Sequence, residues 1–146
     1  MRLRVDVIHG VNLDVLDRRD PEHYGSITLP ELEGRVKGFA SELEMEVTFW
    51  QTNHEGDYCE QLHRATERAD GLLLNPGAWT HYSYAIRDAL EVARVPAVEV
   101  HLSAVDQREE WRHKSVIRDL CVATVQGKGV EGYREALELL KGELPG

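Results

Sequence analysis

Short apolar runs alternate along the chain with segments in which apolar residues recur every three or four positions. The first run contains Val5, Val7 and Ile8 within residues 1–9. Four further runs lie at residues 46–51, 71–75, 97–102 and 121–125. Short apolar runs bounded by turn residues are typical of buried β-strands. The pattern therefore predicts five strands.

The segments between these runs carry helical spacing. Thr28 and Glu31 have the spacing of a capping box, in which two side chains satisfy free N–H groups at a helix start. Apolar residues at helical spacing follow at Leu32, Val36, Phe39, Ala40 and Leu43. The same spacing predicts helices over Tyr58, Leu62, Ala65 and Ala69, over Ala85, Ile86, Ala89, Leu90 and Ala93, and over Tyr133, Ala136, Leu137 and Leu140. Residues 10–26 are predicted to form a polar loop.

The alternation of strands with helices predicts an α/β fold with a parallel sheet covered on both faces. Five strands in this order indicate a flavodoxin-like, doubly wound sheet of order 2-1-3-4-5 in three αβα layers. The length of 146 residues suits one domain, so residues 1–146 are interpreted as a single domain. Ligands of such sheets bind at the carboxyl ends of the strands, where we expect the site.

Composition narrows the class of partner. The net charge of −9 argues against nucleic acid or an anionic membrane as the partner. No apolar run approaches the ~20 residues of a membrane span, and residues 1–9 lack a signal-peptide pattern. Cys59 and Cys121, without a CxxC motif, fit reduced thiols, so we expect a cytoplasmic protein. The 13 arginines favour carboxylate binding, because Arg binds carboxylates bidentately.

Polar side chains gather after the first four predicted strands. They are Asn12, Arg18, Arg19, His23 and Tyr24; then Asn53, His54 and Glu55; then Asn75, Thr80 and His81; and finally His101, Ser103, Arg108 and Arg112. The carboxyl ends of parallel strands meet at one edge of a sheet, so these side chains are expected to converge there. Ordinary surface loops are also polar, and that alternative stays open at this point.

Two pairs of residues are candidates for chemistry. Glu99 and His101 lie two apart in a predicted strand, so they share a face. A carboxylate beside an imidazole orients the ring and favours its protonated form, which makes His101 a candidate general acid. A purely structural ion pair, or a hydrogen bond to a covering helix, is the alternative. His81 and Asp88 are seven apart in a predicted helix with Tyr84 between them, and spacing alone favours a solvated face over a site.

Several cofactor motifs are missing. The turn after the first strand lacks GxGxxG, which argues against a dinucleotide site. The Gly127-Lys128-Gly129 turn has Val122 where a P-loop needs its first glycine. The histidines form neither HExxH nor a close pair, and no lysine falls in a predicted buried strand where a Schiff base would form. The sequence therefore predicts neither a metal nor another cofactor.

Six blocks of sequence together resemble one enzyme family. They are GVNLDVLDRRDPEHYGS at residues 10–26, QTNHEG at 51–56, NPGAWTHYS at 75–83, AIRDA at 85–89, EVHLS at 99–103 and REEWRHKS at 108–115. In this order and spacing, the chain resembles the type II 3-dehydroquinate dehydratases over nearly its whole length. The resemblance implies a hydro-lyase that converts 3-dehydroquinate into 3-dehydroshikimate, a shikimate-pathway step that also serves quinate breakdown.

The resemblance also implies how the substrate loses its proton. Tyr24 matches the family's base, which removes a proton from the carbon next to the ketone and leaves an enolate. A free tyrosine keeps its proton to about pH 10, so a tyrosine base needs positive charge nearby. Arg19, matching the family's lid arginine, and Arg108 would supply that charge. Asn12 matches the residue that helps to hold a water at the enolate oxygen.

The remaining family roles concern the leaving group and substrate binding. His101, oriented by Glu99, matches the acid that protonates the departing hydroxyl. The substrate contacts that carry over are Asn75, His81, Arg112 and the backbone at Leu102 and Ser103. Asp88 matches a residue that reaches the site of the adjacent subunit. Relatives are dodecamers built from trimers, so the resemblance implies a homo-oligomer of that kind here.

This sequence departs from the family pattern at a few positions, namely Val11, Asp17, Ala104, Asp106 and Lys128. Val11 stands where the family usually has Pro, and Asp17 where it usually has Gly; both flank the lid that carries Arg19. Two alternatives to the dehydratase stay open. One is a paralogue that dehydrates a related ring such as an amino-dehydroquinate. The other is a non-catalytic binding member, which would require the Tyr24, Arg19 and His101 set to be broken.

Overall fold

A computed structural model describes residues 2–145, and its centre is a sheet of five parallel strands. The strands are β1 (Leu3–His9), β2 (Met45–Gln51), β3 (Gly71–Asn75), β4 (Ala97–His101) and β5 (Ala123–Gln126). They lie in the order β2-β1-β3-β4-β5, so the expected topology is confirmed.

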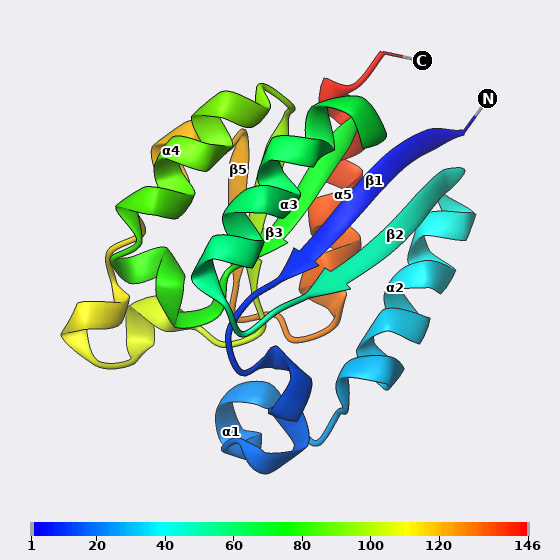
Figure 1. Ribbon diagram of the computed structural model, residues 1–146. Coiled ribbons are helices and arrows are strands. Elements are labelled where there is room, and N and C mark those ends of the chain that lie inside the picture. The colour runs from blue at the N-terminus through cyan, green and yellow to red at the C-terminus, as the bar shows by residue number, and fades with distance from the viewer. Residues whose placement is uncertain (1, 146) are drawn as a thin grey trace.

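Four long helices cover the two faces of the sheet (Figure 1). They are α2 (Leu29–Glu42), α3 (Glu55–Arg68), α4 (Tyr84–Ala93) and α5 (Glu131–Glu143). Buried side chains of α2 and α5 form one core with the sheet, and those of α3 and α4 form the other. The three layers give the flavodoxin-like αβα architecture that the sequence predicts.

Strand β3 shows why the central strands are apolar throughout. Leu73 packs into the core beneath α2 and α5. Its neighbours Leu72 and Leu74 pack into the core beneath α3 and α4. Successive side chains of a strand point to opposite faces, and here helices cover both faces. The uninterrupted apolar run therefore follows from the layered fold.

The expected capping box begins α2. The backbone N–H of Glu31 donates to the Thr28 hydroxyl at 3.3 Å, and the Thr28 N–H donates to the Glu31 carboxylate at 3.3 Å. Capping of this kind contributes about 1 kcal/mol to helix stability. It fixes the point at which the chain leaves the preceding loop for α2.

Two expectations about local structure are wrong. The segment 10–26 is partly helical, since a 3-10 turn (Leu13–Arg18) precedes the short helix α1 (Pro21–Tyr24). His81 and Asp88 do not share a helix, because His81 ends a separate 3-10 turn. The Ser83 side chain accepts a hydrogen bond from Ile86 N and so caps α4, which begins after it.

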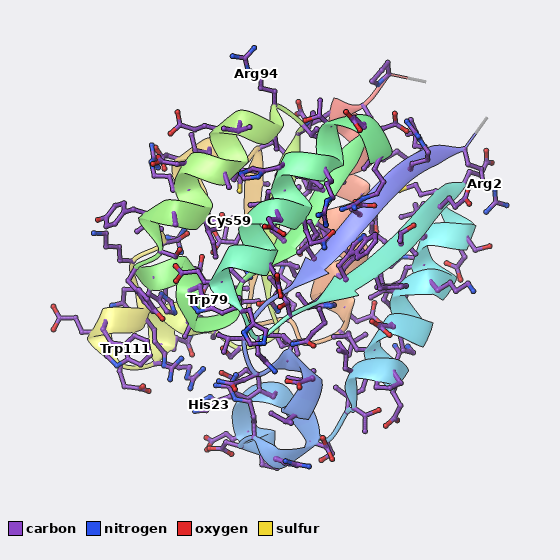
Figure 2. All side chains as sticks on the ribbon, viewed as in Figure 1. Arg2, His23, Cys59, Trp79, Arg94 and Trp111 are labelled. Atoms are coloured by element: carbon purple, nitrogen blue, oxygen red, sulfur yellow. The ribbon has the colours of Figure 1, made fainter. Side chains whose placement is uncertain are left out.

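The loops at the carboxyl ends of the strands lie together at one edge of the sheet. In Figure 2, His23, Trp79 and Trp111 mark this edge, while Arg2 and Arg94 lie at the opposite one. Helix α1 projects from the carboxyl edge below β1 (Figure 1). None of the helices described within residues 2–145 is long and apolar enough to cross a membrane.

Candidate active site

A narrow pocket lies at the carboxyl edge, between the α1 segment and the ends of β3 and β4. Its lining contains nine of the expected site residues, namely Arg19, Tyr24, Asn75, His81, His101, Leu102, Ser103, Arg108 and Arg112. The free volume is about 20 Å³, which is of the order of a single water molecule. A wider hollow of about 640 Å³ adjoins it and shares Tyr24, Leu102, Ser103 and Arg108.

Tyr24 lies between two guanidinium groups. Nη1 of Arg108 donates a hydrogen bond to the Tyr24 phenolic oxygen at 2.6 Å, and also contacts the Ser103 hydroxyl at 3.2 Å. The Arg19 guanidinium carbon lies 4.1 Å from the centre of the Tyr24 ring. Hydrogen bonds from cationic donors are stronger than neutral ones and stabilise negative charge on the acceptor. The arrangement is suited to a phenolate.

The arginines also act on one another. The pKa of Arg19 is lowered, chiefly by burial and further by the charges of Arg108 and Arg112, against the opposing influence of Tyr24. Arg112 is held by Glu109, which accepts a hydrogen bond from its Nε at 2.8 Å. Although the whole chain is acidic, this pocket is therefore locally positive, and it favours an anionic ligand.

His101 is held from below by a buried carboxylate. The distance between His101 Nε2 and Glu99 Oε2 is 2.6 Å, which confirms that the two side chains share a face of β4. Glu99 also accepts hydrogen bonds from Thr80 Oγ1 at 2.5 Å and from Ser115 Oγ at 2.8 Å. Burial alone raises the pKa of Glu99, but the hydrogen bonds and charge of His101 and the two hydroxyls lower it overall. Glu99 is thus kept as a carboxylate that orients the His101 ring, whose Nδ1 is left for a ligand.

His81 is fixed by its surroundings on the other side of the pocket. The distance from its Nδ1 to the carbonyl oxygen of Lys114 is 2.6 Å. Its ring meets Trp111 edge to face, with 5.3 Å between the ring centres. Burial lowers its pKa, and the charges of His101 and Arg112 lower it further, against the Lys114 carbonyl and Glu99. A carbonyl can only accept, so Nδ1 carries the proton and Nε2 of the neutral ring is an acceptor.

Asn75 ends β3 and enters the pocket from the opposite face of the sheet. Its Oδ1 accepts a hydrogen bond from Gly77 N at 3.1 Å, and its Nδ2 donates to the Tyr133 hydroxyl at 3.0 Å. The Tyr133 oxygen also lies 2.9 Å from Nε2 of the fully buried His9. The Asn75 amide is therefore anchored from beneath by side chains of β1 and α5.

Three expected site residues are not in the pocket lining, and one of them, Glu99, lies directly behind it against His101. Asn12 is exposed and has a left-handed backbone with φ of 68°, and its N–H donates to Asn53 Oδ1 at 2.8 Å. Asp88 is exposed on α4, outside the pocket. The structure thus brings together the tyrosine, histidines and arginines of the expected set with Asn75, and leaves Asn12 at the edge and Asp88 outside.

The turn after β1 passes very close to the turn after β3. A Cβ atom added to Gly10 would lie 2.2 Å from the carbonyl oxygen of Pro76. One added to Gly77, where φ is +66°, would lie 2.7 Å from the carbonyl oxygen of Val11. Only glycine fits at these two contacts. They hold the segments that carry Asn12 and Asn75 against each other.

Sequence reasoning did not identify four side chains that support the site. Thr80 was expected at the edge, but its bond to Glu99 was not, and Ser115 carried no local signal. The sequence pattern predicts Tyr133 only as a residue of a helix's apolar face and His9 only as a strand residue. A polar side chain at the last position of a strand, paired in register with Asn75, is a signal that identifies His9. Among residues 2–145, no three His, Cys, Asp or Glu side chains are placed to hold a metal ion.

Comparisons with known proteins cover nearly the whole chain. The family model for dehydroquinase class II matches residues 3–141. A 3-dehydroquinate dehydratase of Bacillus licheniformis is 48% identical over 131 residues, which are 90% of this chain and 90% of that relative. The type II dehydroquinase structure from Butyrivibrio crossotus superposes with a TM-score of 0.92 at 39% identity, covering 96% of this chain and 98% of the other. The structure from Propionibacterium acnes gives a TM-score of 0.90 at 38% identity, covering 97% and 98%.

Proposed function

Because this chain belongs to the dehydroquinase class II family and is therefore a hydro-lyase, we propose that it removes water from 3-dehydroquinate through an enolate, to give 3-dehydroshikimate. This is a step of the shikimate pathway. The observation that carries the proposed mechanism is the pairing, in one pocket, of a tyrosine under two guanidinium groups with a histidine held by a buried carboxylate.

In the first half of the reaction, Tyr24 acts as the base. Its phenolate takes a proton from the carbon next to the ketone, and the electron pair of the broken C–H bond moves toward the ketone oxygen. Arg108 and Arg19 stabilise the phenolate before the transfer by their positive charge. Asn12 helps to hold a water molecule that donates to the enolate oxygen. Preorganised donors of this kind stabilise developing charge without any covalent intermediate.

In the second half, His101 acts as the acid. The enolate electrons return to form the C=C bond, the C1–O bond breaks, and the hydroxyl leaves as water with a proton from His101. Glu99 supports this role, because a buried carboxylate at 2.6 Å favours a protonated imidazole and fixes the ring. One proton is removed and one is delivered, so the reaction needs no cofactor, metal or Schiff-base lysine.

The substrate is held by groups around these two residues. We propose that its carboxylate binds the backbone N–H groups at Leu102 and Ser103, and that its hydroxyls contact Asn75, His81 and Arg112. The positive charge of the pocket supports an anionic substrate. The narrow pocket itself holds about 20 Å³ of free volume, and we propose that the segment carrying Arg19 and Tyr24 moves for substrate entry and release.

We propose further that subunits assemble into a dodecamer of trimers. The exposed Asp88 would then reach the pocket of an adjacent subunit rather than its own. Light scattering of the purified protein tests this, with a mass near twelve times 16.6 kDa expected. A monomer in solution would contradict the assembly and the role given to Asp88.

The test of the function is direct. The product has a new conjugated enone, so addition of 3-dehydroquinate to the purified protein is expected to raise the ultraviolet absorbance. Tyr24→Phe is expected to lower kcat by about 10²- to 10⁴-fold, the usual contribution of a positioned base. Tyr82→Phe is the matched control, because this tyrosine is 59% exposed and outside the pocket.

The alternatives predict different results. Turnover of an amino analogue in preference to 3-dehydroquinate would indicate a paralogue acting on a related ring. Binding of 3-dehydroquinate without any absorbance change would indicate a non-catalytic member. A fully active Tyr24→Phe variant would leave the dehydratase activity in place but remove the proposed base.

A further inference from the structure

The orientation of the Asn75 side-chain amide is decided by two neighbours on opposite sides. Gly77 N–H is a donor, so the atom 3.1 Å from it must be the Asn75 oxygen. The nitrogen Nδ2 then lies 3.0 Å from the Tyr133 hydroxyl, to which it donates one of its two hydrogens. The second hydrogen of Nδ2 remains for the pocket, which Asn75 lines.

The same reasoning decides which hydrogen bonds the Tyr133 hydroxyl accepts and donates. It accepts from Asn75, so its own proton is free to be donated elsewhere, and His9 Nε2 lies 2.9 Å away. If Nε2 is the acceptor, the only group in this row of hydrogen bonds that lacks a partner is His9 Nδ1–H. If Nε2 carried the hydrogen instead, the Tyr133 O–H would also lack a partner. Buried donors without partners are costly, so the first arrangement is favoured.

The register of the sheet explains why these groups meet. His9 and Asn75 are paired residues of adjacent strands β1 and β3. Because alternate side chains of a strand point to the same face, both side chains point to the face of the sheet that α5 covers. Tyr133 belongs to α5 itself. His9 and Tyr133 are both fully buried. Burial lowers the pKa of His9 to about 4, so the ring is neutral at physiological pH and can accept the Tyr133 proton.

We propose that Tyr133 and His9 are positioning residues that act through Asn75, holding its amide so that an N–H donor faces the substrate. An N–H donor binds an oxygen acceptor, such as a hydroxyl or carboxylate oxygen. It cannot bind an ammonium group, which only donates. The chain His9–Tyr133–Asn75 therefore selects an oxygen over a protonated amine at this point of the substrate. This inference rests on the proposed function for its substrate, while its geometry is independent of it.

The first experiment compares Tyr133→Phe with Tyr58→Phe. Both tyrosines are fully buried, and the Tyr58 hydroxyl donates to the Ile8 carbonyl at 2.9 Å in the opposite core. Both substitutions remove a buried hydroxyl, so both are expected to lower thermal stability. Only Tyr133→Phe is expected to raise KM, by about tenfold, with kcat changed less than threefold. An equal effect of both variants on KM would overturn the proposal.

The second experiment tests whether Tyr133 acts through Asn75. In an Asn75→Ala background, Tyr133→Phe is expected to cause no further rise in KM, because the amide that it positions is gone. An additive effect of the two substitutions would contradict the proposed route. His9→Gln keeps an acceptor for the Tyr133 proton, so its KM is expected to stay close to the wild-type value. His9→Leu removes the acceptor and is expected to raise KM as Tyr133→Phe does.

A substrate-free measurement separates this inference from the function itself. Nitrogen-15 spectra of the His9 ring are expected to show the Nδ1–H tautomer at pH 7, and Tyr133→Phe is expected to shift the Asn75 side-chain amide signals. If the wild-type protein fails to turn over 3-dehydroquinate but shows these signals, the proposed function fails and the positioning chain stands. An Nε2–H tautomer of His9 would overturn the positioning chain whatever the activity.

Discussion

Arg108 donates a hydrogen bond from Nη1 to the phenolic oxygen of Tyr24 across 2.6 Å, although 84 residues separate the two in the chain. Its buried Nε has no hydrogen-bond partner among the described residues. Tyr24 ends helix α1, and Arg108 follows the 3-10 turn after β4. The proposed base therefore depends on contact between the α1 segment and the loop after β4.

The first prediction concerns Arg108. Arg108→Ala removes the charge and the hydrogen bond at Tyr24, and is expected to lower kcat by about 10²- to 10³-fold, as for other preorganised donors. Arg108→Lys keeps the charge but loses the planar guanidinium, so an intermediate loss is expected. Steady-state kinetics with 3-dehydroquinate measure both. Arg134→Ala is the control, because this arginine of α5 pairs with Glu42 of α2 and does not line the pocket. An Arg108→Ala variant with near-normal kcat would show that Tyr24 does not depend on it.

The second prediction concerns the hydroxyl groups that hold Glu99. Thr80→Val and Ser115→Ala each remove a hydrogen bond to the carboxylate, so each is expected to raise the pKa of Glu99. Glu99 would then take up a proton at a higher pH and would stop supporting the protonated His101 ring. The acid limb of the kcat/KM profile is expected to move to higher pH, with a loss of roughly threefold to tenfold on the acid side of the profile and little change at neutral pH.

Thr66→Val is the matched control for this experiment. Its hydroxyl donates to the Ala93 carbonyl at 2.7 Å, in a partly buried position between α3 and α4. It is expected to cost stability without moving the pH profile. If Thr80→Val lowers activity equally at every pH, the threonine is structural and does not tune Glu99.

Much of the architecture is predictable from the sequence because it follows from local periodicity. Strand runs and helical stripes indicate the five-stranded sheet, and the Thr28–Glu31 spacing indicates the start of α2. The Glu99–His101 contact follows from the two-residue repeat of a strand, without knowledge of any other part of the fold. These features depend on neighbours in the chain.

The rest of the site depends on tertiary contacts that no local pattern specifies. Helix α1 has a recognisable start, with Asp20 as the cap and Pro21 at its first position, but only four residues follow that signal. In the sequence, Tyr133 looks like any apolar residue of an amphipathic helix, since spacing does not reveal which groups its hydroxyl contacts. Ser115 reaches Glu99 from a long loop whose path is set by packing.

The third prediction follows from the buried His9. Its pKa of about 4 in the folded chain lies below the ordinary value of 6.5. Between these values the unfolded chain binds a proton that the folded chain does not, so the free energy of unfolding falls as pH falls from 6.5 to 4. The free energy of unfolding is expected to fall by roughly 3 kcal/mol in total over this range. Above pH 6.5 the neutral His9 ring causes no loss. Urea unfolding of the wild type and of His9→Gln across this range isolates the effect, since the variant lacks the titrating ring. Parallel pH curves would show that His9 titrates normally.

The fourth prediction concerns the crossing of the two turns beneath the pocket. Gly10→Ala places a Cβ atom 2.2 Å from the Pro76 carbonyl oxygen, and backbone cannot move aside as a flexible side chain can. The variant is expected to lose about 1–3 kcal/mol of stability, the usual range of overpacked sites, and to lose activity even where it folds, because the segments of Asn12 and Asn75 separate. Gly34→Ala is the control. That glycine is exposed within α2, and an added Cβ meets nothing within 4 Å, so the variant is expected to gain about 0.5–1 kcal/mol through helix propensity. If the close approach at Gly10 holds the site together, thermal unfolding is expected to shift in opposite directions in the two variants, and only Gly10→Ala is expected to lose turnover. A Gly10→Ala protein as stable and active as the wild type would mean that the two turns can separate without cost to the site.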